Sequence, residues 1–204
     1  MVKIIRYGLS GNPVTLAHAR IVEILVGKCK KLIVAVCGPR DDKETSRLLS
    51  PADRAALAVL GFPDLPQNVE LDLADLGRIN QKERQSTYVQ MKFLRDLMKG
   101  SDLWLAVGTD QVRGGRLASS EIQLKWIFGQ RLWNEFGFYV FHRPGYELDQ
   151  LDCPPLSKLL AINMDVSSSK ARKAAEIGDR DALLLHVNEQ VADYILSRGL
   201  YRAS

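Results

Sequence analysis

Thr15 and His18 stand three residues apart in the segment "GLSGNPVTLAH", between an apolar run and an amphipathic stretch. At i and i+3 on a helix, a hydroxyl and an imidazole share one face. Asn12 and Pro13 are typical of a helix start, whose free N–H groups and positive dipole end attract anions. The segment therefore predicts a phosphate-binding turn. A surface threonine beside a packed histidine remains the alternative.

A second candidate lies in "MDVSSSKARKAAEIGD", where three serines precede an expected helix and Arg172 follows one turn later. Hydroxyls at a helix start and a guanidinium can hold phosphate through directed, charge-assisted hydrogen bonds. Ordinary serine capping with a solvated arginine is the alternative. Two such helix starts fit a ligand with several phosphates. The P-loop and G-x-G-x-x-G motifs do not occur in the sequence, which disfavours those nucleotide sites.

Short apolar runs recur along the chain: "KIIRYG", "KKLIVAVCG", "NVELDLADL", "DLWLAVG" and "FGFYVFHR". Amphipathic stretches of helical length lie between them, at residues 13–26, 51–60, 86–99 and 119–136. This alternation predicts an α/β fold, a Rossmann-like, open, mostly parallel sheet with helices on both faces. The last third adds a helical C-terminal segment, with one helix expected at 169–177. We expect one domain over residues 1–204.

Length and composition limit the remaining classes. No apolar run of the 204 residues approaches the ~18 needed to cross a bilayer, so we expect no membrane partner. The net charge is +4, and no basic block exceeds three residues, so nucleic acid is not expected either. The three cysteines have no metal-like spacing, no acidic cluster suggests a metal site, and a reducing cytoplasm is the simplest compartment. The oligomeric state, including a homo-oligomer, stays open.

Two motifs carry a resemblance. "GLSGNPVTLAH" resembles the amino-terminal signature of the nucleotidylyltransferase superfamily, and "VSSSKAR" is similar to its second signature. Within the superfamily the chain most resembles the bacterial-type nicotinate-nucleotide adenylyltransferases, because "GPRDDK", "LLSPADRAALA", "AVGTDQV", "FHRPGY" and "VADYILSRGLY" follow in family order. The resemblance implies an enzyme of NAD biosynthesis that joins AMP from ATP to a pyridine mononucleotide, preferring nicotinate mononucleotide, and releases pyrophosphate.

The resemblance also implies residue roles. Catalysis falls to His18, Thr15 and Arg172, with His18 stabilising charge on the reacting group. Besides these three, the implied ATP-binding residues are Gly8, Leu9, Ser10, Lys43, Gly108, Asp110, Ser167, Ser168 and Ser169. The implied acceptor-binding residues are Thr87, Tyr88, Trp126 and Arg143, and for Trp126 packing in a helix core is the alternative. No protein metal ligand is implied, because Mg²⁺ would be carried with ATP.

Some residues depart from the family pattern. Ala17 replaces a glycine, Gly11 stands where an aromatic is usual, and Val89 lacks a hydroxyl expected against the acceptor. The connection "QVRGGRLASSEIQLK" is longer and more basic than usual. These changes bear on substrate choice more than on reaction class. Pantetheine-phosphate adenylyltransferase, which shares the Thr-x-x-His version of the first signature, and a non-catalytic nucleotide-binding relative are the alternatives.

Overall fold

The structure is a computed structural model that describes residues 1–38, 49–77, 86–142 and 148–202. The chain divides into two compact units. Unit 1 comprises residues 1–8, 25–33 and 85–164, and unit 2 comprises residues 9–24, 34–84 and 165–204. The single domain expected from the sequence stays a prediction.

The described strands form one six-stranded sheet in the order β3-β2-β1-β4-β5-β6. The pairs β1–β4, β4–β5 and β5–β6 are parallel, with Ile5 opposite Trp104 and Trp104 opposite Gly137. This confirms the α/β fold. The strands are β1 (Val2–Leu9), β2 (Lys31–Val36), β3 (Val69–Asp72), β4 (Ser101–Gly108), β5 (Gly137–His142) and β6 (Ser157–Ala161). The sequence did not predict β6.

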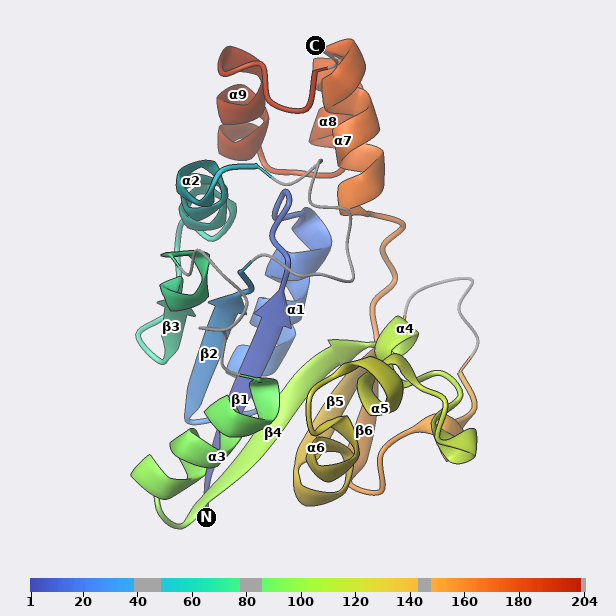
Figure 1. The fold of residues 1–204 in the computed structure, drawn as a ribbon. Helices are drawn as coiled ribbons and strands as arrows, with labels where there is room; N and C mark the ends of the chain where they lie inside the picture. The colour runs from blue at the N-terminus through green and yellow to red at the C-terminus, as the bar shows by residue number, and fades with distance from the viewer. Residues whose placement is uncertain (39–48, 78–85, 143–147, 203–204) are drawn as a thin grey trace. The chain divides into compact units, whose positions relative to one another are not determined.

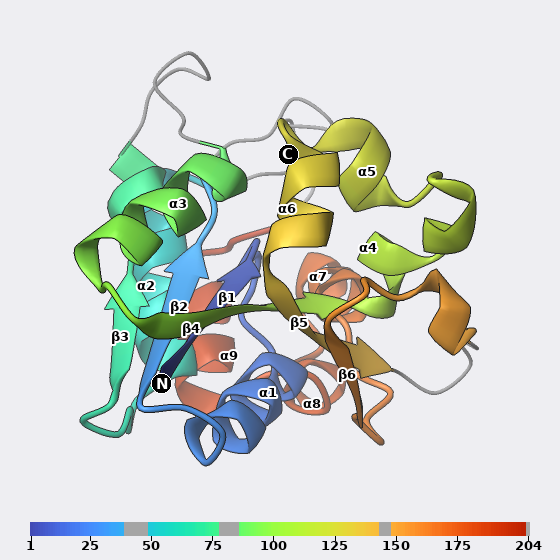
Figure 2. The ribbon, with the colours of Figure 1, turned by 90° about the horizontal axis from the view of Figure 1, so that it is seen from below.

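In unit 1, α3 (Thr87–Leu97) and α6 (Gly129–Glu135) cover one face of β4 and β5 (Figure 2). On that face Leu103, Leu105 and Val107 alternate along β4 and are buried. Trp104 and Ala106, which point to the other face, are buried as well. Because both faces of β4 are covered, its sequence reads as a continuous apolar run, as expected for a parallel strand.

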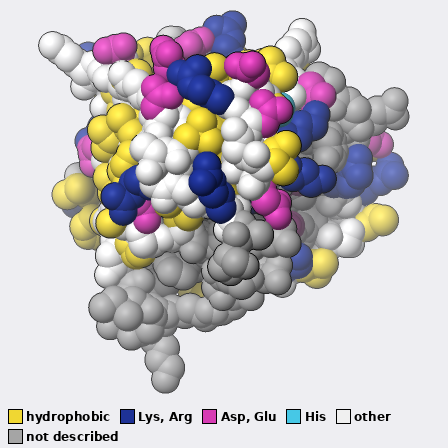
Figure 3. All heavy atoms as spheres, turned by 90° about the horizontal axis from the view of Figure 1, so that it is seen from above, with side chains coloured by type: hydrophobic (Ala, Val, Ile, Leu, Met, Phe, Trp, Pro, Cys, Tyr) yellow, Lys and Arg dark blue, Asp and Glu magenta, His cyan; other side chains and the backbone are white. Residues whose placement is uncertain are grey.

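Unit 2 carries the helical C-terminal segment that the sequence predicts. Its helices α2 (Pro51–Gly61), α7 (Ser168–Ile177), α8 (Arg180–Leu184) and α9 (Glu189–Ser197) share an apolar cluster (Figure 1). Leu57 of α2 and Ile195 of α9 are fully buried in it. Outside the cluster Arg180 pairs with Glu189 and Asp193. On the face drawn in Figure 3, basic and acidic side chains both occur, and several of them lie next to one another.

Two predicted helices were wrong in extent. The first, α1 (Leu16–Val26), begins three residues later than expected, because the Thr15 carbonyl accepts from the N–H groups of His18 and Ala19 and starts the helix there. The stretch 119–136 is broken into α5 (Glu121–Lys125) and α6. Phe128 takes φ +60° at the break, which an uninterrupted helix does not allow. The remaining short elements are η2 (Ala74–Gly77), α4 (Thr109–Val112), η4 (Gly115–Leu117) and η5 (Gln150–Asp152).

Candidate active site

The start of α1 fixes the imidazole of His18. The backbone N–H of Thr15 donates to His18 Nδ1 at 2.9 Å, and Thr15 Oγ1 lies 2.8 Å from the same nitrogen. Because a backbone N–H can only donate, Nδ1 is an acceptor, and a neutral ring then carries its proton on Nε2. Thr15 is buried and His18 is half-buried. Thr15 therefore caps the helix and orients a ring N–H donor at the same time.

The second helix start meets the segment that precedes Thr15, within the same unit. Arg172 Nη1 donates to the Asn12 carbonyl at 2.8 Å, and Ser168 Oγ donates to the Pro13 carbonyl at 3.0 Å. Arg172 Nη2 donates to Ser169 Oγ at 3.2 Å. The structure thus brings the two motifs that the sequence predicts to bind phosphate to one place in unit 2.

The start of α7 follows the serine pattern. The Ser167 side chain accepts from the backbone N–H of Lys170 at 3.2 Å and is the N-cap, so Ser168 and Ser169 lie in the first turn instead of before the helix. Ser169 is exposed and Arg172 is half-buried. Capping therefore accounts for one serine, while the other two present hydroxyls at the positive end of the helix.

Two residues that the sequence did not single out also hold this segment. Arg54 of α2 is only 2% exposed and donates to the carbonyls of Ser10 and Cys37. The Tyr201 hydroxyl donates to Asn12 Oδ1 at 2.8 Å. The signals were present, because Arg54 lies in "LLSPADRAALA" and Tyr201 ends "VADYILSRGLY", but neither motif by itself indicates a role.

Gly8, Gly108 and Asp110 lie in unit 1 at the carboxyl ends of the paired strands β1 and β4. Gly108 is the N-cap of α4, and a Cβ at this position would collide with Asp110 Oδ1. Asp110 is exposed and accepts from Gln111 Nε2 at 2.6 Å. Leu9, which is buried, and Ser10, which is half-buried, belong to unit 2.

Of the residues expected to bind the acceptor mononucleotide, the three that the structure describes pack in unit 1. Tyr88 is buried, and its hydroxyl donates to Glu135 at 3.0 Å, so burial and this carboxylate raise the pKa of Tyr88. Thr87 is the half-buried first residue of α3. Trp126 packs against the apolar cluster of this unit, which favours its core alternative. The acceptor roles of these residues stay predictions.

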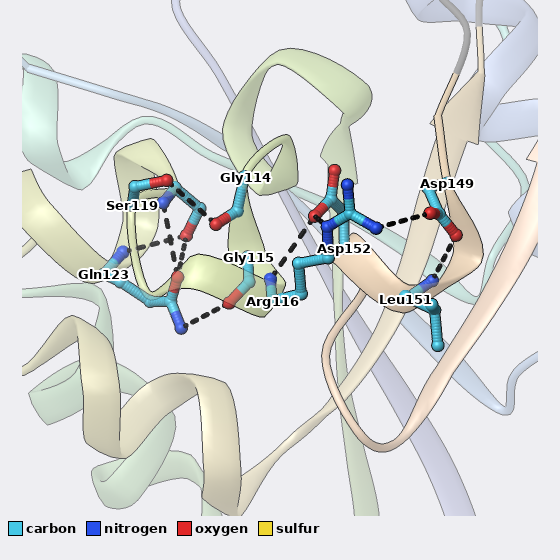
Figure 4. Close-up of polar contacts among 9 residues, drawn as sticks. Gly114, Gly115, Arg116, Ser119, Gln123, Asp149, Leu151 and Asp152 are labelled. Atoms are coloured by element: carbon cyan, nitrogen blue, oxygen red, sulfur yellow. Dashed lines mark hydrogen bonds and ion pairs between the residues drawn. The ribbon is translucent and has the colours of Figure 1, made fainter.

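The basic connection after Asp110 is tied down by carboxylates (Figure 4). Arg116 Nη1 lies 3.0 Å from Asp149 Oδ2, and Arg116 Nε lies 3.7 Å from Asp152 Oδ1. The Arg116 backbone N–H also donates to Asp152 at 3.3 Å. Nearby, Ser120 and Gln123 form a reciprocal cap at the start of α5. The guanidinium of Arg116 thus joins η4 to η5.

Lys43 and Arg143 lie outside the described residues, so their predicted roles stay untested. Within the part of the chain that is described, no group of three or more His, Cys, Asp or Glu side chains is placed to hold a metal ion. The same part contains no helix with the length and apolar character to span a bilayer.

No family model matches the chain. It is 25% identical over 207 residues to the probable nicotinate-nucleotide adenylyltransferase of Rubrobacter xylanophilus, covering 97% of this chain and 91% of that protein. The corresponding protein of Aliarcobacter butzleri is 28% identical over 172 residues, covering 83% of this chain and 86% of that one. The chain is thus similar, along most of its length, to two proteins named as probable nicotinate-nucleotide adenylyltransferases.

Solved structures agree in fold. The nicotinic acid mononucleotide adenylyltransferase of Plasmodium falciparum, complexed with NaAD, has a TM-score of 0.76 at 22% identity and covers 98% of both chains. The same protein complexed with APC has a TM-score of 0.74 at 20% identity, again over 98% of both chains. The fold that the resemblance implies is therefore confirmed along the chain.

The structure gives physical reasons for two departures from the adenylyltransferase pattern. Gly11 has φ +57°, and a Cβ here would lie 3.3 Å from Val36 Cγ1, so a side chain is disfavoured both by backbone conformation and by space. Ala17 is buried, at 2% exposed, so its methyl group packs inside unit 2. Val89 is 39% exposed on α3, and nothing in the structure explains its replacement of a hydroxyl.

Proposed function

We propose that this protein is an adenylyltransferase of NAD biosynthesis. It joins the AMP moiety of ATP to a pyridine mononucleotide, with nicotinate mononucleotide preferred, and releases pyrophosphate. The observation that carries the proposal is the meeting of two helix starts: Arg172 and Ser168 donate to the carbonyls of Asn12 and Pro13, which lie shortly before the Thr15–His18 cap. Similarity to a curated adenylyltransferase along 97% of the chain supports it.

The reaction needs positioning and charge neutralisation more than proton transfer. A 5′-phosphate oxygen of the mononucleotide forms a bond to the α-phosphorus of ATP. The bond from that phosphorus to the bridging oxygen breaks, and its electron pair leaves with pyrophosphate. Because a phosphate monoester is already a competent nucleophile, no general base and no covalent enzyme intermediate is required.

The residues of unit 2 take separate roles in this scheme. With Nδ1 occupied by Thr15, the Nε2–H of His18 is the donor to negative charge that develops on the reacting phosphoryl group. Arg172, with Ser168 and Ser169, binds the β- and γ-phosphates of ATP at the start of α7. The resemblance also assigns Lys43 to the departing pyrophosphate, and this role stays a prediction.

Magnesium enters as part of the Mg-ATP substrate. Mg²⁺ binds substrate phosphates readily and keeps several of its waters, so it does not need a cage of protein carboxylates. When bound with ATP, Mg²⁺ would neutralise part of the negative charge on the departing pyrophosphate. The reducing cytoplasm remains the proposed compartment.

The acceptor preference follows from charge and from the named relatives. The two pyridine mononucleotides differ in a carboxylate or a carboxamide, and the net charge of +4 assists an anionic acceptor. Because Val89 offers no hydroxyl, we propose that selectivity is relaxed, with nicotinamide mononucleotide used less well. A hydrogen bond missing from a dry site is worth about 1–3 kcal/mol, which narrows a preference more readily than it reverses one.

The test is pyrophosphate release from Mg-ATP with a panel of phosphorylated acceptors. We expect release with nicotinate mononucleotide, weaker release with nicotinamide mononucleotide, and none with phosphopantetheine. Competition between the two pyridine nucleotides at equal concentration then measures the preference. A dominant amide product would overturn the preferred acceptor, and release with phosphopantetheine alone would overturn the pyridine class.

A further inference from the structure

The Leu-Tyr ending of the sequence resembles the family pattern, but the proposed chemistry gives it no role. In the structure Tyr201 leaves the end of α9 and reaches back 189 residues, where its hydroxyl donates to Asn12 Oδ1 at 2.8 Å. Asn12 is itself buried, at 6% exposed. A hydroxyl near the last described residue thus contacts the segment that precedes the first phosphate-binding helix.

The backbone is shaped to deliver this hydroxyl. The N–H of Leu200 donates to the Ile195 carbonyl at 3.0 Å, and Gly199 turns with φ +60°. Tyr201 itself has φ +67°, a left-handed conformation that residues with a side chain rarely adopt. Such conformations persist where the surrounding contacts enforce them, and they concentrate at functional sites.

The surroundings of Tyr201 keep its hydroxyl protonated. Burial raises the pKa of Tyr201, and the nearby guanidinium groups of Arg172 and Arg54 only partly oppose that shift. Asp53 acts in the same direction as burial. The hydroxyl therefore stays a hydrogen-bond donor over the ordinary pH range, as its contact with the Asn12 carbonyl-type oxygen Oδ1 requires.

Asn12 links Tyr201 to Arg172. Its side-chain oxygen accepts from Tyr201, while its backbone carbonyl accepts from Arg172 Nη1 at 2.8 Å. Arg172 Nη2 is held by Ser169 Oγ at 3.2 Å. Two nitrogens of the guanidinium are thus anchored, which sets the plane of the group, and one of the two anchors depends on where Asn12 is held.

We propose that Tyr201 is a positioning residue for ATP, which holds Asn12 and through it fixes the guanidinium of Arg172 for the phosphate groups. This proposal rests on the proposed function, in which Arg172 binds phosphate. A purely structural reading would make Tyr201 a cap on the apolar cluster of unit 2, against which its ring packs. The two readings differ in what the hydroxyl contributes to nucleotide binding.

Tyr201→Phe keeps the ring and removes the hydroxyl. Tyr194→Phe is the matched control, because the Tyr194 hydroxyl donates to Asp53 Oδ1 at 3.0 Å and its ring packs against the same cluster. Both variants lose one tyrosine hydrogen bond in unit 2, so we expect similar, small decreases in melting temperature. Only Tyr201→Phe lies on the path to Arg172.

Calorimetric titration with Mg-ATP alone, without acceptor, measures the Kd of each variant. We expect Tyr201→Phe to raise this Kd by about 3–10-fold, the scale of one lost hydrogen bond, and Tyr194→Phe to change it by less than about twofold. In a double-mutant cycle, Tyr201→Phe should have no further effect once Arg172→Ala is present. The wild-type arm with acceptor measures pyrophosphate release in parallel.

The outcomes separate the two proposals. Equal Kd values for Tyr201→Phe and Tyr194→Phe, or additive effects of Tyr201→Phe and Arg172→Ala, would overturn the positioning role. Wild-type protein that binds Mg-ATP but releases no pyrophosphate with any acceptor would overturn the proposed function, while the binding arm still decides the role of Tyr201. Wild-type protein that does not bind Mg-ATP would overturn the positioning role as well.

Discussion

His18 has a capping role in this structure and a proposed catalytic role, and substitutions can separate the two. Its Nδ1 accepts from the Thr15 N–H at 2.9 Å and completes the cap of α1, whereas Nε2 carries the proposed catalytic donor. Asparagine places its side-chain oxygen close to the position of Nδ1 but has no atom at Nε2. His18→Asn therefore keeps the cap and removes the donor, and His18→Ala removes both.

The two losses have different sizes. A lost N-cap hydrogen bond costs about 1 kcal/mol. With an unfolding entropy of about 2.1 cal/mol/K per residue over 204 residues, that cost lowers the melting temperature by about 2 °C. Loss of one preorganised donor to developing phosphoryl charge slows turnover by about 10²–10³. We expect His18→Asn to show only the second effect and His18→Ala to show both.

Pyrophosphate release under saturating substrates measures turnover, and a thermal melt measures the cap. ATP binding should weaken far less than turnover in both variants, because other donors hold the ground state. Near-normal turnover in a well-folded His18→Asn protein would refute the catalytic role and leave His18 with only its role in the helix cap. A melting temperature that falls equally in both variants would refute the capping argument.

Two further predictions concern stability. Gly11→Ala should lower the free energy of unfolding by about 1–2 kcal/mol in urea titrations, because φ at Gly11 is +57°. Gly27→Ala is the control: nothing lies within 4 Å of a Cβ added there, so the urea midpoint should be unchanged or raised. Burial, assisted by Lys170 and opposed by Asp165, lowers the pKa of His186 below its ordinary 6.5. The neutral imidazole therefore contributes to the free energy of unfolding fully above pH 6.5, and this contribution is lost as the pH falls through the folded-state pKa. Melting temperatures between pH 7 and 4 should therefore fall more steeply for wild type than for His186→Gln, and parallel curves would contradict this reasoning.

The sequence predicts the fold where burial imposes a pattern. β1, β2, β4 and β5 are largely apolar because both of their faces are covered, and the ends of each were predicted to within two residues. β6 was missed because its five residues, Ser157–Ala161, are exposed or half-buried and show no such pattern. The break between α5 and α6 depends on Gly129, whose missing Cβ lets the chain approach the Ile122 carbonyl, a tertiary contact that helical periodicity does not encode.

The site was predictable as a set of motifs but not as a set of contacts. The sequence indicates that Thr15 and Arg172 both serve phosphate, yet the atoms that join their motifs are the backbone carbonyls of Asn12 and Pro13. Because every residue has a backbone carbonyl, such acceptors cannot be recognised from residue type. The start of α1 was misplaced for a related reason, because His18 takes the place that glutamate or glutamine usually holds in a capping box.

The side chains that hold residues 10–13 come from 44, 155, 160 and 189 positions further along the chain. At a translation rate of about 5–20 residues per second, this segment is synthesised roughly 10–40 s before Tyr201. Contacts between such distant positions also form slowly, because a long loop must close first. The segment is therefore synthesised well before its partners and is late to acquire its native contacts, so under the proposed function the phosphate site is complete only after Tyr201, which follows α9, has docked.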